Sequence, residues 1–274
     1  MVNSHDVMSP CSQALPEFLA ENNYQNPHDS ANSPLQRGHR TDQPPWVWLS
    51  EYPSRLANFN LWVGASREGE KGFLDVFPFE ELCYNLKADT PLFVDIGGGI
   101  GHQSRILKTK LPHIPGRIIV QDLPPVIAQA PVTEGIELIG HDFMTEQPIK
   151  GLSAFVTMCI QANNRVSGAR AYYLRNIMHD HADEKAVIIL QQIIKAMDRD
   201  SVILIDDMII PVQGAHWKAT QLDLAMMSAL AAIERTERQW CMLLDMAGLR
   251  IKQICTYTPE LRDSIIVAVP KRSW

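Results

Sequence analysis

The sequence lacks any apolar run close to the roughly 20 residues that a transmembrane helix requires. Met1 to Pro10 is also too polar to form the apolar core of a signal peptide. Lysine and arginine never cluster in blocks that could neutralise several phosphates, and the formal net charge is −6. We therefore expect neither membrane insertion nor secretion, and we expect no nucleic-acid partner.

Cysteine is scarce and scattered along the chain. The number of cysteines is odd, which argues against a disulfide framework, and the C-x-x-C and C-x-H spacings of zinc sites do not occur. The five are Cys11, Cys83, Cys159, Cys241 and Cys255. This pattern indicates a reducing, cytoplasmic environment.

The 274 residues suffice for one large domain with an N-terminal extension. Residues 22–46 are rich in Asn, Pro, Asp, Ser and Gln, and they predict an irregular connector. From Trp46 to Arg67 apolar residues recur near helical spacing, with an interruption expected at Pro53.

Beyond Pro91, strand-like and helix-like segments alternate. A short apolar run, a glycine cluster, a helix-like stretch and a second apolar run follow one another as β-turn-α-β. Later apolar runs are mostly separated by helical patterns and cover 136–139, 171–174, 202–205, 251–255 and 264–269. This alternation predicts an α/β protein with a mainly parallel sheet and helices on both faces, whose ligands bind at the carboxyl ends of the strands.

A glycine-rich loop follows the first of these strands. Residues 95–101 have the pattern D-x-G-x-G-x-G, in which glycine lets the backbone approach a ligand and the next helix offers free N–H groups. The dinucleotide pattern G-x-G-x-x-G does not fit, because His102 stands where its third glycine would be. Asp122, after the next strand, is suited to bind a ribose diol. The alternative is a tight turn in which Asp122 caps the helix that begins near Pro124.

Three further segments carry a resemblance to a known family. They are Ala171 to Asp180 (AYYLRNIMHD), Glu234-Arg235-Thr236, and Asp263 to Pro270 (DSIIVAVP). With the glycine loop, they make the chain resemble the fungal S-adenosylmethionine-dependent O-methyltransferases related to the plant caffeate-type enzymes. The resemblance implies a Rossmann-like class I methyltransferase fold, with a short, mainly helical N-terminal remnant and linker (1–88) before the cofactor-binding domain (89–274).

The resemblance also implies roles for individual residues. The methyl donor would be S-adenosyl-L-methionine, bound by Asp95, Gly97, Gly99, Gly101, Asp122, Asp142, Phe143 and Arg175. The catalytic base would be His179, with Asp207 and Glu234 as its acidic partners. Asp207 is one methylene shorter than the glutamate expected from the plant enzymes. The substrate would be a small hydroxylated molecule, and we expect no metal ion.

These residue types suit methyl transfer to oxygen. The sulfonium already activates the methyl group, so the protein must hold a hydroxyl oxygen in line with it and remove the proton. A phenol, with a pKa of about 10, is mostly protonated at neutral pH, and histidine, with a pKa of about 6.5, can accept its proton. A carboxylate on the other ring nitrogen fixes the tautomer and stabilises the imidazolium.

The same residues have plainer interpretations. A histidine at a strand end is commonly structural, and we expect Asp180 and Asp183 to stabilise the start of the following helix without taking part in chemistry. One alternative is a metal site made of His179, His181, Asp183, Asp206 and Asp207. Either a substrate pocket or the core would contain Met178, Met208, Met226 and Met227.

Two departures from the family bear on activity. The family's N-terminal dimerisation domain, of winged-helix type, is mostly missing, so we expect the homodimer of the family to be impaired. The segment Leu152 to Gly168 is extra sequence between flanks that the family joins almost directly, which is compatible with a retained intron. Because it follows Asp142-Phe143 and precedes Arg175 in the sequence, we expect it to weaken cofactor binding.

Three functions therefore remain open. The first, favoured by His179 and its acidic partners, is O-methyl transfer to a phenolic or enolic hydroxyl of a secondary metabolite. The second is a cyclisation or pericyclic reaction that uses the cofactor electrostatically without methyl transfer, and the His-Asp motif argues against it. The third is an inactive, truncated partner subunit, which the two departures favour.

Overall fold

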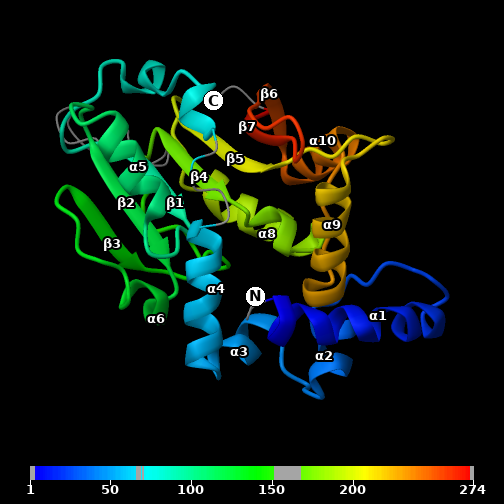
Figure 1. Ribbon diagram of the computed structural model, residues 1–274. Helices are drawn as coiled ribbons and strands as arrows, with labels where there is room; N and C mark the ends of the chain where they lie inside the picture. Colours follow the sequence, from blue (N-terminus) through cyan, green and yellow to red (C-terminus); the bar gives the residue numbers. More distant parts are fainter. Residues whose placement is uncertain (1–3, 66–68, 70, 151–167, 272–274) are drawn as a thin grey trace.

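A seven-stranded sheet forms the centre of the molecule (Figure 1). The computed structural model describes residues 4–65, 69, 71–150 and 168–271. The strand order is β3-β2-β1-β4-β5-β7-β6; the first five in this order are parallel, and β7 runs antiparallel to both of its neighbours. The strands are β1 Pro91–Ile96, β2 Arg117–Asp122, β3 Ile136–Gly140, β4 Ala171–Arg175, β5 Val202–Met208, β6 Leu249–Thr256 and β7 Asp263–Pro270. The predicted mainly parallel sheet is confirmed.

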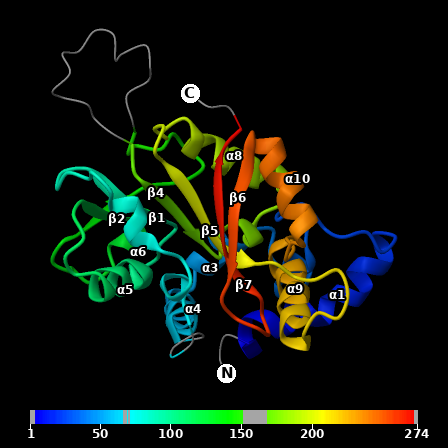
Figure 2. The same ribbon diagram turned by 90° about the horizontal axis from the view of Figure 1, so that it is seen from above.

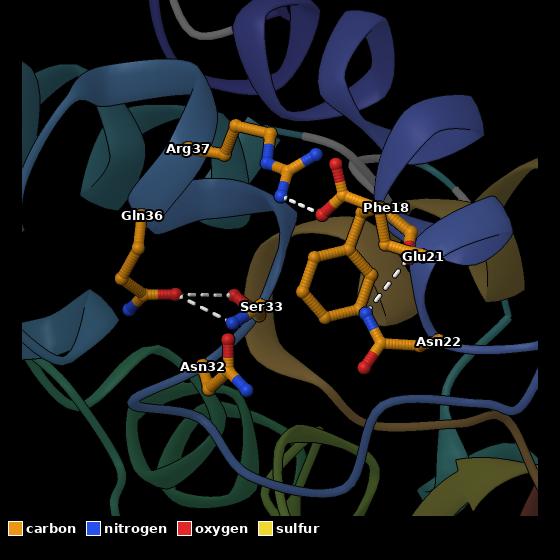
Figure 3. A pocket seen from close by; sticks show the side chains of 7 residues that line it. All are labelled: Phe18, Glu21, Asn22, Asn32, Ser33, Gln36 and Arg37. Carbon is orange, nitrogen blue, oxygen red and sulfur yellow. Dashed lines mark hydrogen bonds and ion pairs between the residues drawn. The ribbon is translucent and has the colours of Figure 1, made fainter.

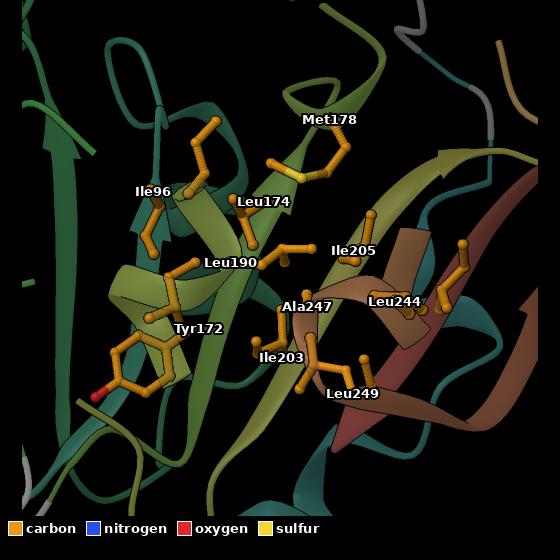
Figure 4. Packing of buried hydrophobic residues seen from close by; sticks show 14 of the residues in the cluster. Ile96, Tyr172, Leu174, Met178, Leu190, Ile203, Ile205, Leu244, Ala247 and Leu249 are labelled. Carbon is orange, nitrogen blue, oxygen red and sulfur yellow. The ribbon is translucent and has the colours of Figure 1, made fainter. Parts of the chain in front are cut away.

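Helices cover both faces of this sheet, as predicted. Strands β1 and β5 are buried along their whole length, as expected for central strands covered on both sides. On one face Leu190 of α8 (Asp183–Ile194) and Leu244 of α10 (Glu237–Ala247) pack against Leu174 and Ile205 (Figure 4). The other face packs against α5 (His102–Lys110) and the short helices η2 (Phe73–Asp75) and η3 (Phe79–Cys83).

The side chains of neighbouring strand residues point to opposite faces, and this alternation divides the core in two. Tyr172 belongs to the cluster under α8 and α10. Tyr173 belongs to the other cluster, where its ring centroid lies 5.0 Å from that of Phe93 and 4.8 Å from that of Phe73. The sheet therefore separates two sets of buried side chains that are adjacent in sequence.

The N-terminal helices form a separate cluster against α9 (Trp217–Leu230), and both ribbon views show α1 beside α9 (Figures 1 and 2). A π-helical turn, η1 (Ser4–Met8), leads into α1 (Ser9–Glu21), and α2 (Pro34–His39), α3 (Pro45–Ser50) and α4 (Pro53–Ala65) follow. Val7, Leu35 and Trp48 pack there against Ala229 and Leu230. Since α9 lies outside residues 1–88, the division at residue 88 stays a prediction.

The connector predicted over 22–46 is not wholly irregular, because α2 lies within it. Ser33 caps this helix: its Oγ accepts the N–H of Leu35 at 3.3 Å, while Gln36 Oε1 accepts the N–H of Ser33 at 2.8 Å. The expected interruption at Pro53 is confirmed, since α3 ends at Ser50 and α4 begins at Pro53. Within the described ranges, no helix is both long and apolar enough to cross a membrane.

The flanks of the extra segment lie close together at the start of β4. The segment itself, Leu152 to Gly168, lies outside the described residues except for Gly168. The Tyr172 hydroxyl accepts the N–H of Ala169 at 3.1 Å and is 2.7 Å from the carbonyl oxygen of Ile149. These contacts are at the amino ends of the strands, whereas Arg175 ends β4 at the opposite edge of the sheet. The order of the residues in the sequence therefore gives no ground for placing the segment's flanks in a site at the carboxyl edge.

We predict that a variant lacking residues 152–167 folds with a Tm at least equal to that of the full chain. The flanks already meet at Tyr172, and shortening a loop reduces the entropy lost on closure, by about 0.6 kcal/mol per halving. Thermal unfolding followed by circular dichroism measures this. As a control, Tyr172→Phe leaves buried backbone groups unpaired and should lower stability by about 1–3 kcal/mol. A clearly lower Tm for the deletion variant would contradict the prediction.

Candidate active site

Polar side chains gather at the carboxyl ends of four neighbouring parallel strands. The glycine loop follows β1, Asp122 ends β2, and Arg175 ends β4 opposite Asp206 of β5. This edge is where open α/β sheets bind ligands. The structure thus places the predicted cofactor loop and the predicted base at one edge, as the pattern of strands implied.

The glycine loop has a backbone that only glycine adopts easily. Gly97 has φ +66°, and a Cβ atom at this position would lie 2.5 Å from Cδ1 of Ile177. Beneath the loop, the buried Asp95 carboxylate accepts a hydrogen bond from Ser104 Oγ at 2.8 Å. Burial raises the pKa of Asp95 to about 6. Asp95 therefore supports the loop from below, and its contact with a cofactor stays a prediction.

Asp122 ties the glycine loop to β2. One carboxylate oxygen accepts the N–H of Gly99 at 2.8 Å, and the other accepts the N–H of Leu123 at 2.7 Å. Burial raises the pKa of this carboxyl. The helix-capping alternative is wrong, since α6 (Pro124–Ile127) has Leu123 at its N-cap and no side-chain cap. Each oxygen retains a second lone pair for another donor.

Phe143 lies between the glycine loop and the loop that follows β4. Its ring is edge-on to His181 with centroids 5.7 Å apart, and its Cε1 would lie 3.5 Å from a Cβ at Gly97. Asp142 is exposed, and its carboxylate accepts the N–H of Met144 at 2.9 Å. The structure brings Phe143 and Asp142 to the same edge as the loop, and their contact with a cofactor stays a prediction.

Arg175 is held near a buried acid rather than paired closely with it. Its Nε lies 3.9 Å from Asp206 Oδ2 and has no hydrogen-bond partner among the residues that the structure describes. Asp206 instead accepts hydroxyls from Tyr173 and, at 2.6 Å, from Tyr257. Arg175 therefore retains an unused donor beside the cofactor loop.

His179 lies in a short helix, η4 (Met178–Asp180), and three carboxylates surround its ring. Its Nδ1 donates to Glu234 Oε1 at 2.7 Å and lies 3.7 Å from Asp207 Oδ1. On the other side, Nε2 lies 3.3 Å from Asp180 Oδ1. His179, Asp207 and Glu234, predicted together from distant parts of the sequence, are thus brought together. His179 is 7% exposed, so the group is almost closed to water.

The surrounding carboxylates determine whether the imidazole of His179 is protonated. Burial lowers the pKa of His179, but Glu234, Asp180 and Asp207 outweigh it and raise the pKa to about 10. Burial also raises the pKa of Asp207 to about 8, although His179 opposes that shift. Neither oxygen of Asp207 has a hydrogen-bond partner in the described part of the chain. At neutral pH the imidazole is protonated, and a positive charge bound beside it would lower its pKa.

The five-residue metal site considered from the sequence is not assembled. Asp206 points to the opposite face of the sheet from Asp207, Asp183 pairs with Arg235, and His181 packs on Phe143. Ligand atoms of His179, Asp207 and Glu234 do lie within 4.8 Å of one another. However, two of these atoms, Nδ1 and Oε1, already share a hydrogen bond, so the geometry favours an oriented base over a metal centre.

Several residues at the site were not predicted from the sequence. Asp180 contacts Nε2, Asp223 Oδ1 accepts the N–H of Glu234 at 2.8 Å, and Arg235 donates to backbone carbonyls on both sides of His179. Asp183 was expected to stabilise the start of α8; it lies in the first turn, but its carboxylate binds Arg235. The signal in the sequence was adjacency, since Asp180 directly follows His179 and Arg235 directly follows Glu234.

The methionines belong mainly to the core. Met178 and Met208 are buried, and Met226 packs on the N-terminal cluster. A separate hollow of about 310 Å³ lies between α1 and α2 (Figure 3). Two pairs of its polar side chains bind each other: Arg37 with Glu21, and Gln36 with Ser33. This hollow therefore offers no reactive group.

Comparisons with known proteins agree with this geometry. A family model described as an O-methyltransferase domain matches residues 83–250. The demethylsterigmatocystin 6-O-methyltransferase of Aspergillus flavus is 39% identical over 274 residues, which cover 100% of this chain and 66% of that protein. The chain thus spans just under two thirds of that relative's length.

Solved structures give the same result. One titled "A Pericyclic Reaction enzyme" is similar with a TM-score of 0.84 and 38% identity, over 98% of this chain and 66% of that one. The structure of LepI in complex with SAM has a TM-score of 0.84 and 38% identity, over 98% of this chain and 65% of that one. The predicted Rossmann-like fold is confirmed.

We predict that Glu234→Gln lowers the pKa of His179 from about 10, because Glu234 is the carboxylate that raises it most. Histidine ring resonances in NMR titrations measure this directly. Asp180→Asn is the matched control and should lower the pKa less, since Asp180 ranks second. A larger effect of Asp180→Asn would contradict the assignment of Glu234 as the main partner.

The same change has a consequence for stability. Folding raises the pKa of His179 from its ordinary value of 6.5 to about 10. Protonated His179 therefore contributes its full stabilisation of the fold below pH 6.5, and this contribution is lost as the pH rises through about 10. The difference in unfolding free energy between wild type and Glu234→Gln should therefore shrink over this range.

Proposed function

Because the chain belongs to the O-methyltransferase family, we propose that it transfers the methyl group of S-adenosylmethionine to a phenolic or enolic hydroxyl of a small secondary metabolite. The observation that carries the proposal is the 2.7 Å hydrogen bond between His179 Nδ1 and Glu234. It orients the ring so that Nε2, which faces Asp180 Oδ1 at 3.3 Å, is the nitrogen left to meet a substrate hydroxyl.

The residues at the strand ends fit this cofactor. The backbone at Gly97, Gly99 and Gly101 would face it, above the supporting Asp95, and the remaining lone pairs of Asp122 would accept the ribose hydroxyls. The other residues that we assign to the cofactor lie at the same edge of the sheet as this loop. They are Asp142, Phe143 and Arg175. S-adenosylmethionine supplies an activated methyl group and a positive charge. Its presence in a LepI structure supports the same assignment here.

His179 would act as the base once it is neutral. With a pKa of about 10 it is protonated in the cofactor-free protein at neutral pH. A sulfonium bound close to the ring would oppose that proton, and the neutral imidazole could then accept the proton of the substrate hydroxyl at Nε2. Glu234 would then stabilise the imidazolium that forms, and Asp207, 3.7 Å from the same nitrogen, is the second acidic partner.

A second candidate is a pericyclic or cyclisation reaction without methyl transfer. It is favoured by the similarity to a structure titled "A Pericyclic Reaction enzyme". The two candidates differ in one product, since only methyl transfer releases S-adenosylhomocysteine.

Incubation with S-adenosylmethionine and demethylsterigmatocystin tests the proposal, because a relative of this chain is a demethylsterigmatocystin 6-O-methyltransferase, which makes this compound the first to try. Release of S-adenosylhomocysteine with a methylated product supports methyl transfer, and a wider set of small phenols extends the search. Cofactor binding without methylation of any of them would refute it. A folded protein that does not bind S-adenosylhomocysteine would instead indicate an inactive partner subunit.

We predict that His179→Ala lowers the rate of methyl transfer by about 10²–10⁴-fold, the usual contribution of general base catalysis. The affinity for S-adenosylhomocysteine should stay nearly unchanged, because no proposed cofactor contact is removed. His113→Ala, an exposed histidine in the turn before β2, is the control. Activity of the His179 variant near that of wild type would exclude the assigned role.

We predict that Asp122→Ala weakens binding of S-adenosylhomocysteine by about 1.5–3 kcal/mol, because the ribose hydroxyls lose a charged acceptor. Isothermal titration calorimetry gives the affinity. Asp245→Ala, which removes an acid on α10 that pairs with Lys271, serves as the matched control. Equal affinities for the two variants would mean that Asp122 only holds the loop.

We predict that S-adenosylmethionine releases a proton on binding and that S-adenosylhomocysteine does not. The two differ by the sulfonium charge, which should lower the pKa of His179 from about 10. Calorimetry in two buffers of different ionisation enthalpy counts the protons released. The affinity for S-adenosylmethionine should rise with pH more steeply than the affinity for S-adenosylhomocysteine. Identical proton release for both ligands would contradict this account of the base.

A further inference from the structure

Arg235 is a fully buried cation that the proposed chemistry does not use. Its exposed fraction is 0%, and its guanidinium lies over the ring of Trp240 at 5.3 Å. Among the residues that the structure describes, its acidic partner is Asp183, whose carboxylate oxygen lies 2.7 Å from Nη2 and 3.0 Å from Nε, and whose side chain is 41% exposed. Because this carboxylate is partly exposed to water, the ion pair alone does not explain why a buried arginine is found at this position.

The remaining donors of Arg235 hold the turn that carries His179. Nη1 donates to the carbonyl oxygen of Met178 at 2.7 Å, and Nη2 donates to that of His181 at 2.8 Å. These two carbonyls lie on either side of His179 and Asp180. The planar guanidinium therefore fixes both ends of the short backbone segment from which the base projects.

The segment that carries Arg235 is itself anchored. The carbonyl of Arg235 accepts the N–H of Ile210, just beyond β5, at 3.1 Å, and Asp223 of α9 accepts the N–H of Glu234 at 2.8 Å. Glu234 then binds the ring of His179 while Arg235 binds its backbone. Two consecutive residues thus determine both where the imidazole lies and which way it faces.

An apolar side chain of similar volume would fill the same space, and exchanging buried ion pairs for apolar residues is often neutral for stability. It would leave the carbonyls of Met178 and His181 without donors. Lysine would keep the charge but not the planar set of donors. The contacts therefore indicate that arginine is required here because it holds the turn in place, and not because it stabilises the fold.

We propose that Arg235 is a positioning residue that directs Nε2 of His179 toward the substrate hydroxyl by holding the backbone on both sides of it. The inference rests on the proposed function. It concerns the orientation of the base, and it does not make Arg235 a group that touches the cofactor or the substrate.

The test compares Arg235→Lys and Arg235→Met with Asp183→Asn, which removes the ion pair but leaves both carbonyl bonds. In the Arg235 variants we expect kcat to fall about 100-fold, as for a base displaced by about 1 Å, with little change in KM or in S-adenosylhomocysteine affinity. Asp183→Asn should have a much smaller effect. In Arg235→Ala, added guanidinium should restore part of the activity.

An NMR titration of His179 keeps this test separate from the test of function, since it needs no turnover. The carboxylates of Glu234, Asp180 and Asp207 face the ring and raise its pKa to about 10, so a loosened turn should let the pKa fall toward 6.5. If wild type transfers no methyl group, the function fails but the titration still decides the inference. An unchanged titration in folded Arg235→Lys and Arg235→Met overturns the proposal. Loss of the fold in both variants also overturns it, because Arg235 would then serve stability alone.

Discussion

The hydrogen bond between His179 Nδ1 and Glu234 Oε1 is the interaction on which the rest of the site depends. It joins the turn after β4 to the segment that precedes α10, two parts of the chain separated by 55 residues. Asp207 and Asp180 complete a group of one imidazole and three carboxylates almost without contact with water. Such a group is stable only while the ring keeps its positive charge or receives another cation close by.

The sheet allows this group to exist beside a second buried acid. Asp206 and Asp207 are neighbours in β5, and strand geometry sends their side chains to opposite faces. Asp206 accepts hydrogen bonds from two tyrosine hydroxyls and lies near the charge of Arg175, whereas Asp207 lies near the imidazole. The same alternation explains why the five-residue metal site, considered as an alternative from the sequence, does not form.

The glycine loop, Asp122 and the parallel sheet could be predicted from the sequence because each depends on residues close together in the chain. His179, Asp207 and Glu234 depended on a resemblance to a family, since no periodicity links positions so far apart. Arg235 could not be predicted, because its role comes from contacts such as that with the carbonyl of Met178, 57 residues apart. Asp180 directly follows His179 in the sequence, but its side chain faces the imidazole and not the start of α8, where it was expected. The short helix α2 was missed because one local cap at Ser33 outweighed a composition typical of loops.

The Tyr172 hydroxyl makes the fold tolerant of insertions and deletions in the segment before β4. It holds Ile149 and Ala169 against the same oxygen atom, so whatever sequence lies between them begins and ends at one point of the scaffold. That point is at the amino edge of the sheet, a strand's length from the glycine loop and the imidazole. Natural variation in exon boundaries could add or remove residues there without altering the register of β4. For the same reason, the position is suited to a reporter domain or to new termini in a circularly permuted protein.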